Sequence, residues 1–198
     1  MRIGAGLDGR LGLSFDELRQ AGREAAGLGF ESLWTPAGGV PDAFHVCAAW
    51  SQDSPVRTGI SVVPVARMWS PLALAVQAAT VGHISDGRFV LGIGTGGYGP
   101  GFWASVGMPD RPIAVMRDYL TVVRGLLAGE TITHDGPALH VQGASLGALD
   151  LPPVPVYRMA PLTTPCPQAP VRHFQAPGSV ARIGDCICPN PTYVCVPM

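Results

Sequence analysis

The sequence predicts an α/β fold in which short buried strands alternate with helices and form a parallel sheet. Three observations support this prediction. Apolar runs that are too short for helices alternate with longer segments of helical periodicity. The strand candidates begin near residues 2, 30, 58 and 88, a regular spacing of about 30 residues that is typical of repeated βα units. Apolar residues make up 47% of the 198 positions and charged residues only 14%, which suits a well-buried globular protein.

Five strands and four long helices are predicted, in alternation. The strands are β-branched or aromatic runs bounded by glycine or proline, at residues 2–7, 30–34, 58–65, 89–93 and 153–157. The helices have apolar residues at helical spacing and cover about residues 15–28, 43–50, 71–83 and 112–127. Between the last helix and the last strand, residues 132–141 contain Asp135-Gly136 and predict an inserted β-hairpin.

Capping residues mark the ends of the helices. Ser14 and Glu17 have the spacing of a capping box, in which each side chain accepts a free backbone N–H group of the first turn. Ser70 followed by Pro71 is typical of an N-cap with proline in the first helical position. Gly29 is expected to end the first helix.

Helical spacing also predicts which residues face the core. The third helix is expected to bury Leu72, Val76 and Ala79. The fourth helix is expected to bury one stripe of apolar residues, Ile113, Met116, Leu120, Val123 and Leu127.

The stretch from Gly87 to Gly97 is the most informative part of the chain. Its strand, residues 89–93, runs into a glycine-rich loop that continues to Gly101. In α/β proteins the carboxyl ends of the strands carry the ligand site, and glycines there let backbone N–H groups approach a phosphate. The spacing Gly92-x-Gly94-x-x-Gly97 also fits a Rossmann dinucleotide fingerprint, but that fingerprint belongs in the first βα unit and this one lies in the fourth.

Two architectures remain open from the residues alone. An open doubly wound sheet can be completed with about five strands. A (βα)8 barrel requires eight units and roughly 250 residues, and this chain offers four units and a fifth strand.

Composition excludes several classes of function. The net charge of −1 gives no reason to expect nucleic acid or an anionic membrane as a partner. All 13 basic residues are arginine, so a Schiff-base or P-loop lysine is excluded. No run reaches the roughly 18 apolar residues of a membrane helix, and the first residues resemble a strand instead of a signal peptide. We therefore expect a cytoplasmic protein with a small-molecule substrate.

The last part of the chain, residues 158–198, differs in composition from the rest. Eleven of the 20 prolines lie at or after Pro152, and four of the five cysteines follow residue 160. Proline at this density interrupts helices and strands, so we expect an irregular tail. It is interpreted either as a disordered extension or as out-of-frame translation of a longer gene. Cys186, Cys188 and Cys195 lack the paired spacing of structural zinc sites, and no metal site is predicted.

Five segments form a set whose order and spacing are informative: Gly87-Arg88-Phe89-x-Leu91-Gly92-x-Gly94-Thr95-Gly96, Pro71 to Thr80, Arg111 to Tyr119, Thr133 to Pro137, and Pro152 to Tyr157. Together they resemble the luciferase-like monooxygenase superfamily of flavin- and deazaflavin-dependent barrels. The resemblance covers about residues 1–157.

The resemblance implies a TIM (βα)8 barrel, here truncated after about strand 5, with residues 1–157 as its N-terminal part. It implies a deazaflavin (coenzyme F-420) or FMN as cofactor, with a slight preference for the deazaflavin, and hydride transfer or oxygen activation as the reaction. The residues it places at the cofactor follow the third and fourth strands: Val65, Ala66, Gly94, Thr95, Gly96 and Gly97. In related barrels the position of Val65-Ala66 supports the flavin ring, sometimes through a non-proline cis peptide bond.

The catalytic residues are unknown from the sequence. Many deazaflavin-dependent members carry an acidic residue or histidine after the second strand, and residues 35–39 of this chain contain neither. Aromatic and basic residues near strand ends are weaker candidates for the pocket: Trp34, Trp69, Trp103, Arg67 and Arg111. His45 and His83 are expected to be structural, and His134 and His140 to be exposed.

Two alternatives to an enzyme of this class stay open. The chain could be a non-catalytic half-barrel that is stable only in association with another chain, since a half-barrel has two unpaired strand edges. It could also be a Rossmann-like nucleotide-binding protein. Whichever holds, a homo-oligomer is expected.

Overall fold

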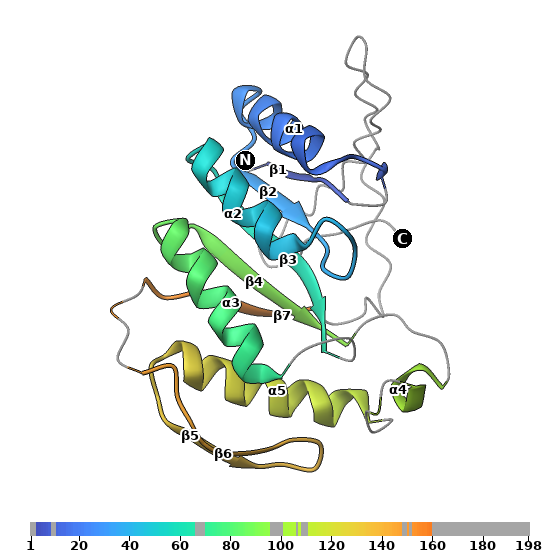
Figure 1. Ribbon diagram of the computed structural model, residues 1–198, viewed down its shortest axis with the longest axis vertical. Helices are drawn as coiled ribbons and strands as arrows, with labels where there is room; N and C mark the ends of the chain where they lie inside the picture. The colour runs from blue at the N-terminus through green and yellow to red at the C-terminus, as the bar shows by residue number, and fades with distance from the viewer. Residues whose placement is uncertain are drawn as a thin grey trace.

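The computed structural model describes residues 3–8, 11–65, 70–95, 101–105, 107, 111–147, 150 and 152–159. Helices and strands alternate along this part of the chain (Figure 1). The elements are β1 (Gly4–Gly6), α1 (Phe15–Gly27), β2 (Ser32–Thr35), α2 (Ala43–Asp53), β3 (Arg57–Pro64), α3 (Pro71–Ile84), β4 (Phe89–Gly94), α4 (Phe102–Ser105), α5 (Pro112–Leu127), β5 (Ile132–Asp135), β6 (His140–Ala144) and β7 (Val156–Met159).

The main sheet is parallel and its strands follow the order of the chain. It contains five strands in the order β1-β2-β3-β4-β7, and each neighbouring pair is parallel. Helices α1, α2 and α3 lie on the same side of this sheet, and α5 packs beside α3 (Figure 1). A doubly wound sheet reverses its strand order and carries helices on both faces, whereas a barrel wall does neither. The described strands therefore have the arrangement of part of a TIM barrel, and the predicted α/β fold is confirmed.

The fifth strand begins and ends at later residues than the sequence predicts. β7 covers Val156–Met159 instead of residues 153–157. Pro153 and Pro155 lack the backbone N–H group that a strand of the ladder donates, so the segment before Val156 contributes only a carbonyl, from Pro155 to the Leu91 N–H at 2.9 Å.

The predicted helix signals are confirmed. The Ser14 N–H donates to the Glu17 carboxylate at 2.8 Å, and the Glu17 N–H donates to Ser14 Oγ at 3.3 Å, which completes the capping box. Ser70 Oγ accepts a backbone N–H of the first turn of α3 at 3.1 Å. Gly29 follows the end of α1 with φ +87°, a left-handed conformation in which glycine is favoured.

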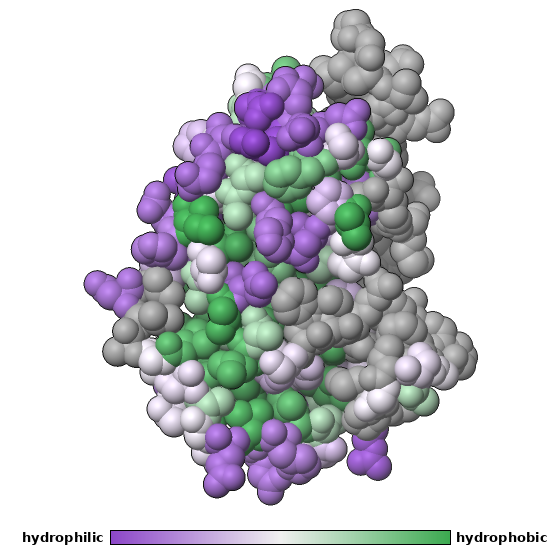
Figure 2. All heavy atoms as spheres, in the orientation of Figure 1, coloured by the Kyte–Doolittle hydropathy of each residue, from purple (hydrophilic) through white to green (hydrophobic). Residues whose placement is uncertain are grey.

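The predicted inward face of α3 is correct at Ala79, which is 5% exposed, and wrong at Leu72 and Val76, which are 41% and 48% exposed. In the stripe predicted for α5, Ile113 is also wrong, at 63% exposed. Helix α3 is apolar around its whole circumference, so periodicity does not select a face. Its buried residues are mostly small, namely Pro71, Leu74, Ala75, Ala78, Ala79, Val81 and Gly82. Small residues on the inner side let the helix lie close to the sheet and to α5, and the larger side chains point outward. Figure 2 shows apolar side chains gathered over α3 and hydrophilic ones over α1.

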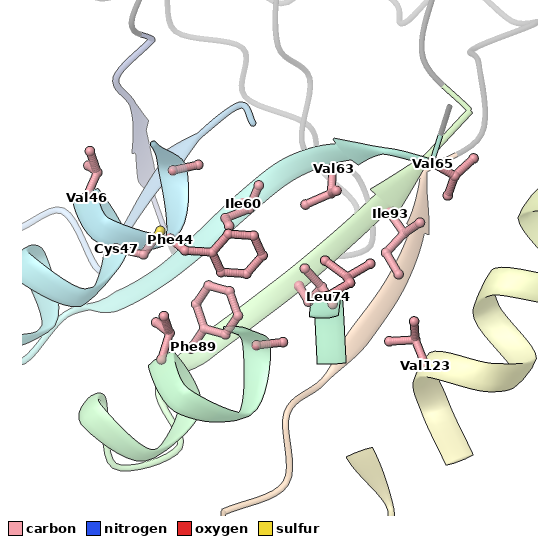
Figure 3. Packing of buried hydrophobic residues seen from close by; sticks show 14 of the residues in the cluster. Phe44, Val46, Cys47, Ile60, Val63, Val65, Leu74, Phe89, Ile93 and Val123 are labelled. Atoms are coloured by element: carbon pink, nitrogen blue, oxygen red, sulfur yellow. The ribbon is translucent and has the colours of Figure 1, made fainter. Parts of the chain in front are cut away.

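The core lies between the sheet and the helices. The rings of Phe44 from α2 and Phe89 from β4 meet at a centroid distance of 6.0 Å (Figure 3). Ile60 and Ile93 extend this cluster along the two central strands, and Leu74 closes it from α3. All five side chains are completely or almost completely buried. This cluster fixes the helices on one side of the sheet.

The predicted hairpin is present and packs against α5. Strands β5 and β6 are antiparallel, and Asp135 pairs with His140. Asp135 is thus the last residue of β5, and the turn follows it with a bond from the Gly136 N–H to the Leu139 carbonyl at 3.0 Å. A second small apolar cluster holds the hairpin on the helices. Among the helices of the described ranges, none is both long and apolar enough to cross a lipid bilayer.

Candidate functional site

The two faces of the main sheet differ in side-chain size. Strand register places one set of aligned residues toward the helices and the alternate set on the opposite face. The opposite face carries glycine or serine at Gly4, Gly6, Ser32, Gly59, Gly92 and Gly94, and larger residues at Trp34, Arg57, Pro64, Val90 and Tyr157. We call this set the glycine face. Helices α1, α2 and α3 lie on the other side of the sheet (Figure 1).

Trp34 is the largest side chain of the glycine face, and it lies across two neighbouring strands. A β-carbon built on Gly4 would lie 3.0 Å from Trp34 Nε1, and one built on Gly59 would overlap the six-membered ring of Trp34. Trp34 Nε1 donates to Ser32 Oγ at 2.9 Å, which fixes the ring orientation. The indole therefore lies flat on the sheet, and glycine is required on both sides of it.

A β-bulge interrupts the pairing of β3 with β4 near the carboxyl end of the sheet. Ile60 pairs with Leu91 and Val63 pairs with Ile93, so Ser61 and Val62 together oppose the single residue Gly92. This is where the register of the two strands shifts.

Glycines on β4 make room for the bulge. A β-carbon on Gly92 would lie 2.5 Å from the carbonyl oxygen of Ile60, and one on Gly94 would lie 2.9 Å from Cγ2 of Val62. The Val62 carbonyl accepts the N–H of Ala37 at 3.2 Å, which ties the loop after β2 to the bulge. Packing against the bulge therefore explains why Gly92 and Gly94 are glycine, and the loop motif alone did not indicate this.

The non-proline cis peptide bond lies within the bulge, between Ser61 and Val62. The sequence-based expectation placed such a bond at Val65-Ala66. The Val65 side chain is 2% exposed and belongs to the helix-facing core (Figure 3). Ala66 lies outside the described residues.

Ser61 carries a buried hydroxyl that lacks a hydrogen-bond partner among the residues that the structure describes. The residue is 6% exposed. Its neighbours in the bulge belong to the glycine face: the Val62 side chain lies beside Gly94, and a β-carbon built on Gly92 would lie 3.6 Å from the Ser61 Cα atom.

The predicted phosphate-side residues are described only in part. Gly94 is the last residue of β4, and Thr95 follows it, partly exposed. Gly96 and Gly97 lie outside the described residues. A contact of these residues, or of Val65 and Ala66, with a cofactor stays a prediction.

The other candidate residues fall in different places. Trp103 is 6% exposed and packs in the core, and Arg111 is exposed at the start of α5. Trp69 and Arg67 lie outside the described ranges. His45, His83 and His140 are exposed. None of these described side chains comes to the bulge.

His134 contradicts the expectation that it is exposed. Its side chain is 20% exposed, and Nε2 lies 3.1 Å from Oδ1 of the buried Asp118 on α5. The contact is close, but its angles are poor for a hydrogen bond. The other carboxylate oxygen of Asp118 accepts the Ala138 N–H at 2.9 Å. This polar cluster fastens the hairpin to α5.

Among the residues that define the glycine face, none carries a thiol, a carboxylate or an imidazole. Burial raises the pKa of the Cys47 thiol. Cys47 lies on α2, and its thiol donates weakly to the Gly59 carbonyl of β3 at 3.5 Å. Burial also raises the pKa of Tyr119, which belongs to the core. Among the described residues no group of three or more possible ligands could hold a metal ion. The tail cysteines lie outside these residues.

Sequence reasoning missed Ser61 and Val62, and it missed the packing role of Gly92 opposite the bulge. One signal was available: Gly92 and Gly94 alternate within an otherwise bulky strand, and glycine inside a strand often marks a bulge or a close backbone approach. The partner strand of the bulge could not be identified from that signal alone.

A family model described as luciferase-like monooxygenase matches residues 2–160. The chain is 34% identical over 122 residues to a Mycobacterium tuberculosis protein named as a coenzyme F-420-dependent oxidoreductase, a match that covers 57% of this chain and 33% of that protein. It is 31% identical over 106 residues to an F-420-dependent glucose-6-phosphate dehydrogenase of Gordonia bronchialis, which covers 52% of this chain and 31% of the other.

Solved structures of low identity share the fold. The F-420-dependent tetrahydromethanopterin reductase of Methanopyrus kandleri has a TM-score of 0.67 at 19% identity, covering 79% of this chain and 49% of that one. The oxygenating constituent of 3,6-diketocamphane monooxygenase from Pseudomonas putida, solved with FMN, has a TM-score of 0.64 at 19% identity, covering 80% and 51%. The chain therefore spans about a third of the length of these curated relatives and about half of these structures.

Proposed function

The chain belongs to the luciferase-like monooxygenase family, and on this premise we propose that it supplies the first half of a flavin- or deazaflavin-dependent oxidoreductase. The reaction is hydride transfer or oxygen activation on a small organic substrate. The bound cofactor supplies that chemistry. The protein binds the ring, orients it and excludes water.

The observation that carries this proposal is the bulge at the carboxyl end of a sheet whose face opposite the helices is rich in glycine. Ligands of parallel α/β sheets bind beyond the carboxyl ends of the strands. A flat ring needs a flat surface, and Gly92 and Gly94 leave the sheet without side-chain bulk beside the bulge. Val62 and Trp34 offer apolar surface at the same face. We propose that the ring lies against Val62, with Gly94 and Thr95 on the phosphate side.

The names of the curated relatives favour coenzyme F-420 over FMN, since the Mycobacterium and Gordonia proteins are both named as F-420-dependent. The FMN-bound neighbour keeps the second cofactor in the proposal. We expect tighter binding of coenzyme F-420.

Fluorescence titration of the 198-residue chain with coenzyme F-420 and with FMN tests the proposal. Saturable binding of at least one cofactor is expected. Gly94→Ala should weaken it, because the new β-carbon displaces Val62. Gly6→Ala is the matched control: it lies on the same face, nothing lies within 4 Å of its new β-carbon, and it should bind like the unaltered chain. A folded protein that binds neither cofactor would contradict the proposal.

A second candidate function is a non-catalytic half-barrel that associates with another chain. It is supported by the sheet itself, because among the described strands β1 and β7 are paired on one side only. Unpaired strand edges favour association. Size-exclusion chromatography with light scattering distinguishes the candidates: a stable oligomer without cofactor binding favours this one.

A further inference from the structure

We propose that the Ser61 hydroxyl is a cofactor-binding group, which forms a hydrogen bond with the polar edge of the ring. This inference rests on the proposed function and deepens it. It assigns a role to a residue of β3 that lies in the bulge and outside the glycine-rich loop.

The first argument is that three other buried hydroxyls, those of Ser51, Thr58 and Ser85, have hydrogen-bond partners within the fold. Ser51 Oγ donates to the Cys47 carbonyl at 2.8 Å and lies 3.0 Å from Thr58 Oγ1. Ser85 Oγ donates to a backbone carbonyl at 3.0 Å and accepts the N–H of Phe89 at 3.0 Å. Ser61 Oγ is equally buried and has no such partner among the described residues. A buried polar atom without a partner destabilises the folded state, so a hydroxyl kept in this condition calls for an explanation.

The second argument is the location of the hydroxyl. Ser61 shares the bulge with Val62 and faces Gly92, where a side chain would collide with the Ile60 carbonyl. The bulge therefore combines an apolar side chain, a surface free of bulk and one polar group. A planar heterocycle with apolar faces and an edge of carbonyl and ring N–H groups matches this combination. A hydroxyl both donates and accepts, so it can serve either kind of edge atom.

The third argument is that the core does not need this hydroxyl. Ile60 and Val63 supply the helix-facing contacts of this part of β3. Replacing Ser61 by alanine removes one oxygen atom and none of those contacts. Ser51 is the opposite case, since its hydroxyl joins α2 to β3 through Thr58.

Ser61→Ala and Ser51→Ala, measured side by side in the 198-residue chain, test the proposal. Ser61→Ala should unfold at the same temperature as the unaltered chain or higher, and should bind coenzyme F-420 roughly five- to tenfold more weakly, as expected for one lost hydrogen bond. The absorption band of the bound cofactor should also shift. Ser51→Ala should unfold roughly 2 to 4 °C lower and bind the cofactor unchanged.

Three results would overturn the assignment. Ser61→Ala could bind the cofactor as tightly as the unaltered chain, which would mean that water or another protein group satisfies the hydroxyl. It could lose as much thermal stability as Ser51→Ala, which would make the hydroxyl structural. If the unaltered chain binds neither coenzyme F-420 nor FMN, the proposed function fails and this inference fails with it, whereas the first two results refute the inference alone.

Discussion

Replacing Gly92 by alanine should destabilise the protein by about 1 to 3 kcal/mol, because the new β-carbon meets backbone that cannot easily move. An ideal β-carbon at this position lies 2.5 Å from the Ile60 carbonyl oxygen and 3.6 Å from the Ser61 Cα atom. Both atoms belong to the bulge, and the pairs Ile60–Leu91 and Val63–Ile93 hold the register on either side of it. Relief of the collision therefore requires a shift of one of the two central strands.

Urea denaturation followed by circular dichroism measures the effect. With a slope of about 2 kcal/mol per molar urea, the midpoint of Gly92→Ala should fall by roughly 0.5 to 1.5 M. Gly6→Ala is the control, since its new β-carbon has nothing within 4 Å. Its midpoint should stay or rise slightly, because alanine has less conformational freedom to lose on folding. Equal midpoints for the two variants would refute the reasoning.

Three further predictions concern the polar contacts and the buried thiol. Asp118→Ala should speed hydrogen exchange in the β5–β6 hairpin roughly tenfold and leave α1 unchanged, because it removes the buried carboxylate that accepts the Ala138 N–H at 2.9 Å and lies 3.1 Å from His134; equal rates in the hairpin would contradict this. The hydrogen bond from Arg19 holds the pKa of Asp53 below its usual range. The stability from this pair is present above the unfolded-state pKa of about 4 and is lost as the pH falls through the lower folded-state value. Thermal unfolding should thus show Asp53→Asn destabilised at pH 7, with the difference shrinking toward about pH 3; a constant difference would argue against the ion pair. Finally, burial raises the pKa of Cys47, so iodoacetamide at pH 8 should leave it unlabelled until the protein is denatured, as peptide mass spectrometry can check. Labelling of Cys47 in the folded protein would count against its burial.

Local signals predicted the elements, and the structure confirms them. The capping box of Ser14 and the N-cap at Ser70 begin helices where expected. The regular spacing of the strands correctly predicted a parallel sheet. The choice between an open sheet and a barrel wall depends on which face each crossover takes, and no local pattern encodes that. The face of α3 was mispredicted at Leu72 and Val76 because hydrophobic residues surround the helix, so the size of the side chains, and not their polarity, decides which ones face inward.

The candidate site was predictable only at the end of β4. Gly94 and Thr95 were expected at a strand terminus and are found there. The bulge arises from the pairing of β3 with β4. Ser61 and Val62 lie in it because they oppose Gly92, which is distant in the chain. Such a relation exists only after the strands pair. Glycine at alternate positions of a strand is the one clue that a single sequence contains.

The Trp34 ring occupies the space that a side chain at position 59 would need, so the sizes of the residues at 34 and 59 depend on each other. A larger residue at 59 would overlap the Trp34 ring, and a smaller residue at 34 would leave space that a β-carbon at 59 could fill. Substitutions at the two positions should therefore compensate each other, with a double variant such as Trp34→Leu with Gly59→Ala closer to the original stability than the sum of its single changes. In related chains we expect the summed side-chain volume at positions 34 and 59 to be conserved, while the residue at each position varies.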